Sequence, residues 1–198
     1  MKPCAIRSIA LTASLLATAS ASALELPADR ANHFDYDYVE GAWADLEDGL
    51  DGFSFGFSHD LRKNIAVTGG LLSASENNAD FDLLHVGAAY HFKSLNMTDT
   101  DVIFHGSLVR SKAKVSGFGF SASDSDTGLR IGAKMRVDLQ PGVEVFGDIS
   151  LTTADEAGDS DILITPGLAI EFTPELDGVV SYEASDREWL HIGLRYYS

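Results

Sequence analysis

Histidines are the residues of this chain with the widest chemical range, because the imidazole ring binds metals and transfers protons near neutral pH. His85, His91 and His105 fall on the charged or polar faces of alternating segments. His85 and His91 are six residues apart, which is about 20 Å along an extended strand, so three histidines cannot meet at one metal ion. We therefore expect these rings to pack rather than to bind a metal.

A second constellation lies near the C-terminus, where His191 follows Ser185 and Glu188. A histidine beside a hydroxyl and a carboxylate is the minimum set for a hydrolase or a lipid-modifying enzyme, with His191 as the base. We expect no catalytic site, and keep the hydrolase as an alternative.

Charged side chains alternate with apolar ones in "GLRIGAKMRVDLQPGVEVFGDISL", residues 128–151. The pattern predicts two antiparallel strands joined by the turn Gln140-Pro141-Gly142, because an odd turn keeps Leu139 and Val143 on one face. This register places Lys134 opposite Asp148 and Asp138 opposite Glu144, with Arg136 diagonally between Glu144 and Asp148. The predicted charge network has five members: Arg130, Lys134, Arg136, Glu144 and Asp148.

Acidic residues outnumber basic ones by 30 to 14, and the net charge of −16 argues against nucleic acid as a partner. Much of this acid lies in "DLEDGLD" and "ADEAGDSD". Flexible segments rich in carboxylate oxygens suit calcium, so loosely bound divalent cations are the only cofactor that we expect. The candidate ligands are Asp45, Glu47, Asp48, Asp51, Asp155, Glu156 and Asp159.

The start of the chain predicts export. Lys2 and Arg7 precede an apolar stretch, and small residues follow at Ala21-Ser22-Ala23, which together indicate a secretory signal peptide over residues 1–23. Cys4 lies inside that segment, so we expect residues 24–198 to form one cysteine-free domain. No later stretch offers the roughly 20 apolar residues of a membrane-spanning helix.

Period-two alternation predicts ten strands, with eight as an alternative. Most have about the 9 to 11 residues that a tilted strand needs to cross a bilayer. In the first strand, a bulge near Val39 would turn Trp43 outward. The ten ranges are 33–44, 52–59, 64–73, 81–92, 101–112, 127–139, 143–152, 161–172, 178–184 and 188–197.

Alternation alone does not say which face meets water, but the connections between the strands do. Every second connection is longer on average and carries most of the acid; one of these is the predicted loop "AKVSGFGFSASDSD", residues 113–126. Aromatic residues gather at both ends of the strands, as in the interfacial girdles of membrane proteins. One girdle would contain Tyr36, Tyr38, Tyr90, Phe92, Phe172, Tyr196 and Tyr197, and the other Trp43, Tyr182 and Trp189.

With its final strand "HIGLRYYS", the predicted domain resembles the single-domain outer-membrane β-barrels of Gram-negative bacteria, including the OmpA-type transmembrane domain and its porin-like relatives. Their assembly signal ends in Phe or Trp, whereas this chain ends in Ser198. The resemblance implies an all-β, closed antiparallel up-and-down transmembrane barrel in the outer membrane. It implies outer-membrane lipid, lipopolysaccharide and the barrel assembly machinery as partners, and says nothing of oligomeric state.

In such a barrel Leu129, Ile131 and Met135 face lipid, and the charge network lines the lumen. We therefore expect a structural or interaction role, with acidic loops above a lumen narrowed by charge. The alternatives are a narrow porin-like channel for small solutes or ions, the hydrolase described above, and a soluble periplasmic barrel of lipocalin type. The last would reverse the two faces and fill the interior with apolar side chains.

Overall fold

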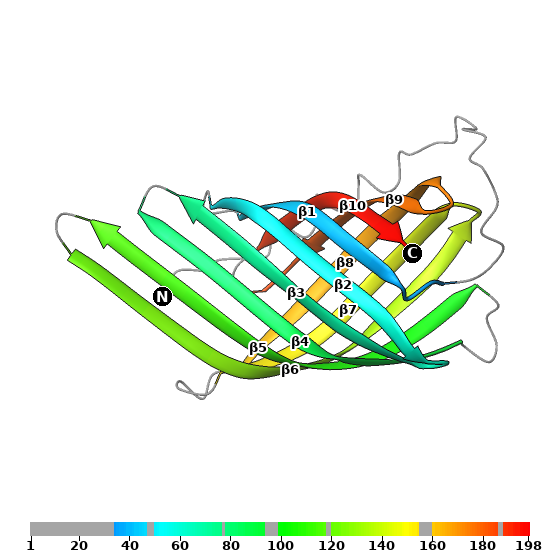
Figure 1. Cartoon of the computed structure of the whole chain (residues 1–198), viewed down its shortest axis with the longest axis horizontal. Coiled ribbons are helices and arrows are strands. Elements are labelled where there is room, and N and C mark those ends of the chain that lie inside the picture. The colour runs from blue at the N-terminus through cyan, green and yellow to red at the C-terminus, as the bar shows by residue number, and fades with distance from the viewer. Residues whose placement is uncertain are drawn as a thin grey trace, which may run out of the picture.

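Ten antiparallel strands close into one barrel in the computed structural model (Figure 1), which describes residues 34–46, 50–76, 78–93, 99–117, 120–154, 160–185 and 188–198. The prediction of ten strands and an up-and-down barrel is confirmed, and the alternative of eight strands is wrong. The predicted signal peptide, residues 1–23, lies outside the described residues. The strands are β1 (Tyr38–Leu46), β2 (Asp51–Arg62), β3 (Ile65–Glu76), β4 (Ala79–Lys93), β5 (Thr100–Gly117), β6 (Phe120–Gln140), β7 (Val143–Ala154), β8 (Ser160–Thr173), β9 (Leu176–Glu183) and β10 (Trp189–Tyr197).

Each strand pairs with its sequence neighbours, and β1 pairs with β10 to complete the ring. Tyr38 lies opposite Tyr197 in this last pairing, which continues without a register shift to Leu46 opposite Trp189. No helix in the described part of the chain is long and apolar enough to cross a membrane.

The two faces of the barrel wall differ sharply in chemistry. Outward positions on β6 are apolar and exposed, such as Leu129 (55%) and Ile131 (60%), whereas the inward Arg136 is only 3% exposed. Among the largest fully buried side chains described are Arg195 and Asp101. A soluble lipocalin-like barrel needs the reverse arrangement, so that alternative is wrong. The outward apolar row continues around the barrel through Phe53, Phe55, Leu84, Val86, Phe104, Leu108, Ile149, Ile162, Ile164, Ile192 and Leu194.

Three of the four connections at one end of the barrel, which we call the turn end, are tight turns, and the fourth, between β4 and β5, spans residues 94–99. The hairpins β2–β3, β6–β7 and β8–β9 each have a two-residue connection and a register shift just before it. In β6–β7 the connection is Pro141-Gly142, with Gly142 at a φ of 77°, and the shift lies between Asp138 and Gln140. Gln140 is therefore paired with Val143, and the turn has two residues where the sequence predicted three. The extra residue at the bulge still leaves Leu139 exposed, so its predicted facing is confirmed.

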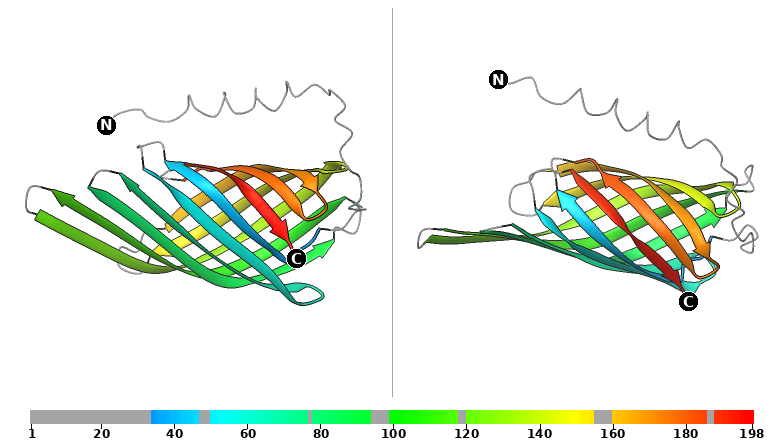
Figure 2. Two further views of the ribbon diagram at one scale, coloured as in Figure 1. Left: turned by 45° about the horizontal axis from the view of Figure 1, so that its top comes forward. Right: turned by 90° about the horizontal axis from the view of Figure 1, so that it is seen from above.

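The opposite end, which we call the hairpin end, is uneven because β5 and β6 run far beyond their neighbours (Figure 2). Residues 113–117 and 120–126, predicted as loop, continue the ladder up to the pair Gly117 and Phe120. The pairing of β6 with β7 begins only at Gly128. The prediction of a loop over residues 113–126 is therefore wrong for its described residues, which form a projecting hairpin.

The first strand and the aromatic girdles need correction. β1 keeps regular register with both neighbours and needs no bulge near Val39, because Trp43 already faces outward. Tyr36, Tyr197 and Trp189 were expected in the girdles, but all are buried at 4–5% exposure inside the barrel. Tyr38 lies on the same inward face of β1 as Ala42 and Ala44. Tyr90, Phe172 and Tyr196 do face outward.

Candidate functional site

The turn end of the lumen is filled by a cluster of two arginines and two glutamates: Glu40, Arg136, Glu144 and Arg195, which we call the lumen cluster. Arg136 on β6 donates two parallel hydrogen bonds to Glu144 on β7, from Nε to Oε1 at 2.9 Å and from Nη2 to Oε2 at 2.5 Å. Such a bidentate contact fixes both planar groups and is stronger than a single hydrogen bond. The contact is buried, since Arg136 is 3% and Glu144 8% exposed.

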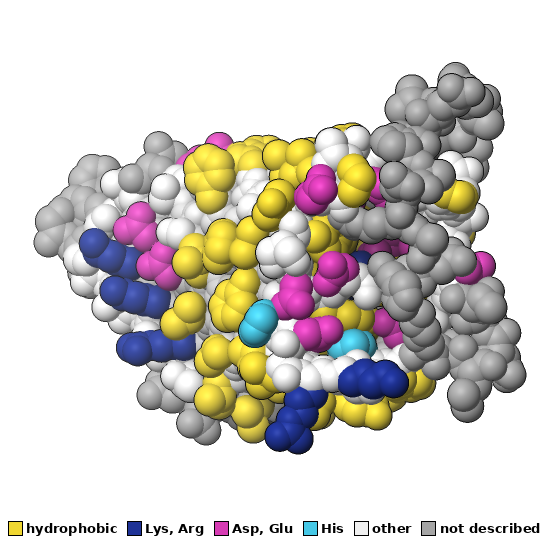
Figure 3. Space-filling model, turned by 45° about the vertical axis from the view of Figure 1, so that its right-hand side comes forward, with side chains coloured by type: hydrophobic (Ala, Val, Ile, Leu, Met, Phe, Trp, Pro, Cys, Tyr) yellow, Lys and Arg dark blue, Asp and Glu magenta, His cyan; other side chains and the backbone are white. Residues whose placement is uncertain are grey.

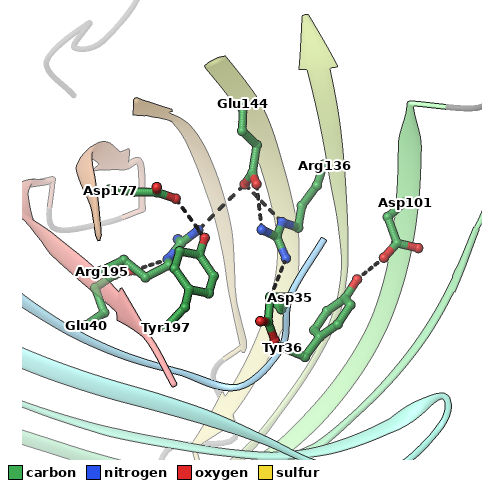
Figure 4. Close-up of polar contacts among 9 residues, drawn as sticks. All are labelled: Asp35, Tyr36, Glu40, Asp101, Arg136, Glu144, Asp177, Arg195 and Tyr197. Carbon is green, nitrogen blue, oxygen red and sulfur yellow. Dashed lines mark hydrogen bonds and ion pairs between the residues drawn. The ribbon is translucent and has the colours of Figure 1, made fainter. Parts of the chain in front are cut away.

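Arg195 on β10 joins this pair to the other side of the barrel. Its Nε lies 2.9 Å from Glu40 on β1, and its Nη1 lies 3.7 Å from Glu144. Nη1 also donates to the Tyr197 hydroxyl at 3.4 Å, which in turn donates to Asp177 on β9 at 2.8 Å. Charged and polar side chains from β1, β6, β7, β9 and β10 therefore meet across the lumen (Figure 4).

The segment before β1, residues 34–37, lies across the same end of the barrel. The backbone carbonyl of Asp35 accepts a hydrogen bond from Arg136 at 3.3 Å, and the Asp37 carboxylate accepts one from the Asp60 backbone amide on β2 at 3.0 Å. The Phe34 ring lies 4.7 Å below the Arg136 guanidinium, in range of a cation–π contact. This segment contacts strands on opposite sides of the lumen and so covers the opening that the lumen cluster leaves.

Tyr36 anchors the segment. Its ring stacks on His91 of β4 with centroids 3.6 Å apart, and its hydroxyl donates to the buried carboxylate of Asp101 on β5 (Figure 4). Burial raises the pKa of the Tyr36 phenol above its ordinary value, so the hydroxyl keeps its proton and acts as the donor.

The middle of the lumen differs from the prediction in one contact. Lys134 lies opposite Asp148 in the register, but Asp148 bonds to His105 Nε2 at 2.7 Å. Lys134 instead places its ammonium 4.2 Å above the Phe146 ring. The fifth predicted member, Arg130, donates to the Thr152 hydroxyl at 3.1 Å, away from the lumen cluster. The structure thus joins Arg136 to Glu144 and leaves the other three predicted members in separate contacts.

Glycines make room for two of these rings. A methyl group added at Gly167 would lie 2.1 Å from the Phe146 ring, and one added at Gly132 would lie 2.7 Å from the His105 ring. Phe146 and His105 therefore hold their positions because β8 and β6 lack side chains there.

Above the lumen cluster the barrel is hollow. A cavity of about 210 Å³ reaches from Tyr36 and Arg136 to His85 and Arg130. A second cavity, of about 590 Å³, continues from His85 and Arg130 toward the hairpin end and is lined there by Asp124 and Asp126. Bonded side chains therefore cross the lumen at the turn end, and cavities occupy the lumen beyond them.

The other predicted sites are only partly described. Asp45 and Asp51 lie opposite each other in the pairing of β1 with β2. The structure does not describe the remaining predicted cation ligands, Glu47, Asp48, Asp155, Glu156 and Asp159. Within the described ranges no three His, Cys, Asp or Glu residues are placed to hold a metal ion. His191 faces the larger cavity with its Nδ1 3.4 Å from the Ser54 hydroxyl.

Sequence reasoning missed Glu40, Tyr36 and Arg195. A usable signal was present for Arg195, because it shares the parity of His191 and Gly193 in an alternating strand. The neighbours of Arg195 become visible only when β10 closes against β1.

Comparison with known proteins supports the fold and no closer relationship. No sequence family matches the chain, and neither does any characterised protein. Among solved structures, the KdgM porin is similar to it with a TM-score of 0.51 over 81% of this chain and 99% of the porin, at 9% identity.

Two other solved barrels are similar at lower scores. The N-terminal β-barrel domain of Pseudomonas aeruginosa OprF has a TM-score of 0.47 at 12% identity, covering 80% of this chain and 96% of that domain. Ail, the attachment invasion locus protein of Yersinia pestis, has 0.45 at 17% identity, covering 80% and 94%. The similarity to the KdgM porin shows a shared fold, the closed antiparallel β-barrel.

Proposed function

We propose that this chain is exported through a cleaved signal peptide and spans the outer membrane as a structural or interaction protein rather than as an open pore. Its wall supports this placement, because apolar side chains face outward and arginine, aspartate and glutamate face inward. In hydrocarbon only a closed barrel satisfies all the backbone groups of a sheet.

The observation that carries the proposal is the group of bonded side chains that crosses the lumen at the turn end. Arg136, Glu144, Arg195 and Glu40 form a chain of contacts across the lumen, with residues 34–37 over it. Ions and solutes passing through the barrel must displace these buried, mutually bonded groups. A rigid barrel of this kind presents its loops at one surface without conducting.

Planar-bilayer recording of the refolded protein tests the proposal. The wild type is expected to show little conductance, and the double variant Arg136→Ser with Glu144→Ser is expected to conduct in discrete steps. Removing both partners avoids leaving one buried charge without its counter-charge. The matched control, Arg62→Ser with Lys63→Ser, removes exposed cations at the same end and should behave as the wild type.

A narrow porin-like channel is the second candidate. It is favoured by the two lumen cavities, which share His85 and Arg130 in their walls and so lie end to end. Steady conductance of the wild type, unchanged by the double variant, would establish this candidate and refute the closed barrel.

The acidic outer segments are expected to collect divalent cations that bridge to lipopolysaccharide phosphates. Asp45 and Asp51 support this idea, because like charges directly opposite on paired strands repel unless they are screened. Calorimetry of the barrel in detergent is expected to show a higher melting temperature with millimolar calcium. An unchanged melting temperature would remove the cation proposal and leave the barrel proposal intact.

A further inference from the structure

Three cations stand in a column on the outer wall, on one strand of an otherwise acidic protein. Arg110, Lys112 and Lys114 occupy alternate positions of β5, and all three are exposed. They continue the outward row of Leu108, which is 57% exposed and belongs to the apolar belt. We call these three residues the basic column.

The basic column has no counterpart elsewhere on the described outer wall of the hairpin end. Arg130, Lys134, Arg136 and Arg195 line the lumen, and Arg62 and Lys63 lie at the turn end. Figure 3 shows cationic side chains in a column beside acidic ones, where the surface turns from apolar to polar at the end from which β4, β5 and β6 project. Positive charge at this end of the described wall is therefore concentrated on β5.

The cations of the basic column form no ion pair with neighbouring acids among the described residues. On β4, Asp82 lies opposite Lys112 and Asp80 lies opposite Lys114, but the ion pairs found within the described ranges join other residues. Asp82 instead accepts a hydrogen bond from Ser73 at 2.7 Å. The ammonium and guanidinium groups remain available to an external anion.

A groove of about 340 Å³ lies on the wall at the foot of the basic column. Its outward side chains come from β3, β4 and β5. Leu71 and Leu84 are apolar, and the polar side has two cations, Arg110 and Lys112, against one carboxylate, Asp82, which is bonded to Ser73. One side of the groove therefore suits a hydrocarbon chain and the other suits an anion.

We propose that this groove binds a phosphate-bearing lipid of the surrounding leaflet, with its phosphate at Arg110 and Lys112 and an acyl chain against Leu84 and Leu71. The inference rests on the proposed membrane placement and names the partner there as an anionic, phosphorylated glycolipid. The distance along β5 from Leu108 to Lys112 is about 13 Å, which carries the column from the hydrocarbon edge through the headgroup layer. Lys and Arg at that depth attract anionic headgroups.

Binding of lipid A with two phosphates, presented to the folded barrel in neutral detergent micelles and followed by native mass spectrometry, tests the proposal. The variant Arg110→Gln, Lys112→Gln, Lys114→Gln is expected to weaken binding by about tenfold to a hundredfold. The variant Asp80→Asn, Asp82→Asn is expected to strengthen it. Leu84→Ser should weaken binding of the acylated lipid while leaving the charge unchanged.

The control Arg62→Gln, Lys63→Gln removes exposed cations at the turn end and should bind as the wild type. Equal loss in this control, or full binding by the triple variant, overturns the proposal. Complete displacement of the lipid by millimolar inorganic phosphate also overturns it, because the site would then hold any free anion. Bilayer conductance of the same preparations reports separately on the closed barrel, so failure of one proposal is distinguishable from failure of the other.

Discussion

The turn end and the hairpin end of this barrel are built from the same strands but are stabilised differently. At the turn end, charged groups bond to one another across the lumen and the segment of residues 34–37 packs against them. At the hairpin end the lumen widens to a cavity of about 590 Å³, and β5 and β6 leave the barrel altogether. The contrast indicates that strand pairing maintains the barrel wall at both ends, and that bonded side chains inside the lumen add stability at the turn end and narrow the lumen there.

Neutralising a carboxylate at the turn end should therefore lower the free energy of unfolding far more than neutralising one at the hairpin end. Glu144→Gln leaves Arg136 and Arg195 buried with less counter-charge, and we expect the free energy of unfolding to fall by about 3 kcal/mol. Glu183→Gln, in the wall of the larger cavity, should cost less than about 1 kcal/mol, because a cavity of about 590 Å³ has room for water that would screen its charge. Urea unfolding of both variants in the same lipid measures the difference, and equal losses would contradict the contrast.

Packing around Phe146 gives the next largest effect. Gly167→Val puts a side chain into the Phe146 ring, and overpacking of this kind is expected to cost about 2 kcal/mol. Gly147→Ala is the matched control, since a methyl group there meets nothing within 4 Å. If both variants unfold at the wild-type urea concentration, Phe146 does not hold the interior of the turn end in place.

The middle of the lumen should show a smaller and more selective effect. A double-mutant cycle of His105→Gln and Asp148→Asn is expected to give a coupling energy of about 1 kcal/mol, because their side chains bond at 2.7 Å. The cycle of Lys134→Met and Asp148→Asn should give nearly zero. A larger coupling energy between Lys134 and Asp148 than between His105 and Asp148 would instead support the ion pair that the sequence predicts.

The smallest effect is expected at the tip of the projecting hairpin. Replacing residues 117–120 with Asn-Gly removes, among the described residues, only the pairing of Gly117 with Phe120, so the free energy of unfolding should change by less than about 0.5 kcal/mol. At the turn end, adding a single methyl group should lower the free energy of unfolding more than this deletion does. Gly142→Ala forces a positive φ of 77° on a side-chain residue, at about 1 kcal/mol. A larger loss from the hairpin deletion would show that the tip supports the wall.

Alternation made most of the wall predictable from sequence. Between residues 128 and 151 large apolar residues alternate with charged ones, so facing and register follow from parity, including Lys134 opposite Asp148. In "SASDSD" both faces are polar, and the strand extension carries no such contrast. Under the proposed membrane placement this hairpin lies outside the hydrocarbon and needs no apolar row, so the sequence carried no alternation from which to predict a strand.

The interior was predictable only where its partners are close in sequence. Arg136 and Glu144 belong to one hairpin, and the expected diagonal reach between them is present. Glu40 and Arg195 are 155 residues apart and meet only through the pairing of β1 with β10. Tyr36 and Tyr197 were assigned outward because aromatic residues favour interfaces, although the parity of Tyr197 with Arg195 points inward.

The position of Tyr36 determines how the segment before β1 is attached to the barrel. Its ring and hydroxyl contact β4 and β5 from inside the lumen, while the segment continues directly into β1. Residues 34–37 are therefore fixed to the wall at two separate places. Peptide bonds of this segment are expected to resist limited proteolysis of the folded barrel.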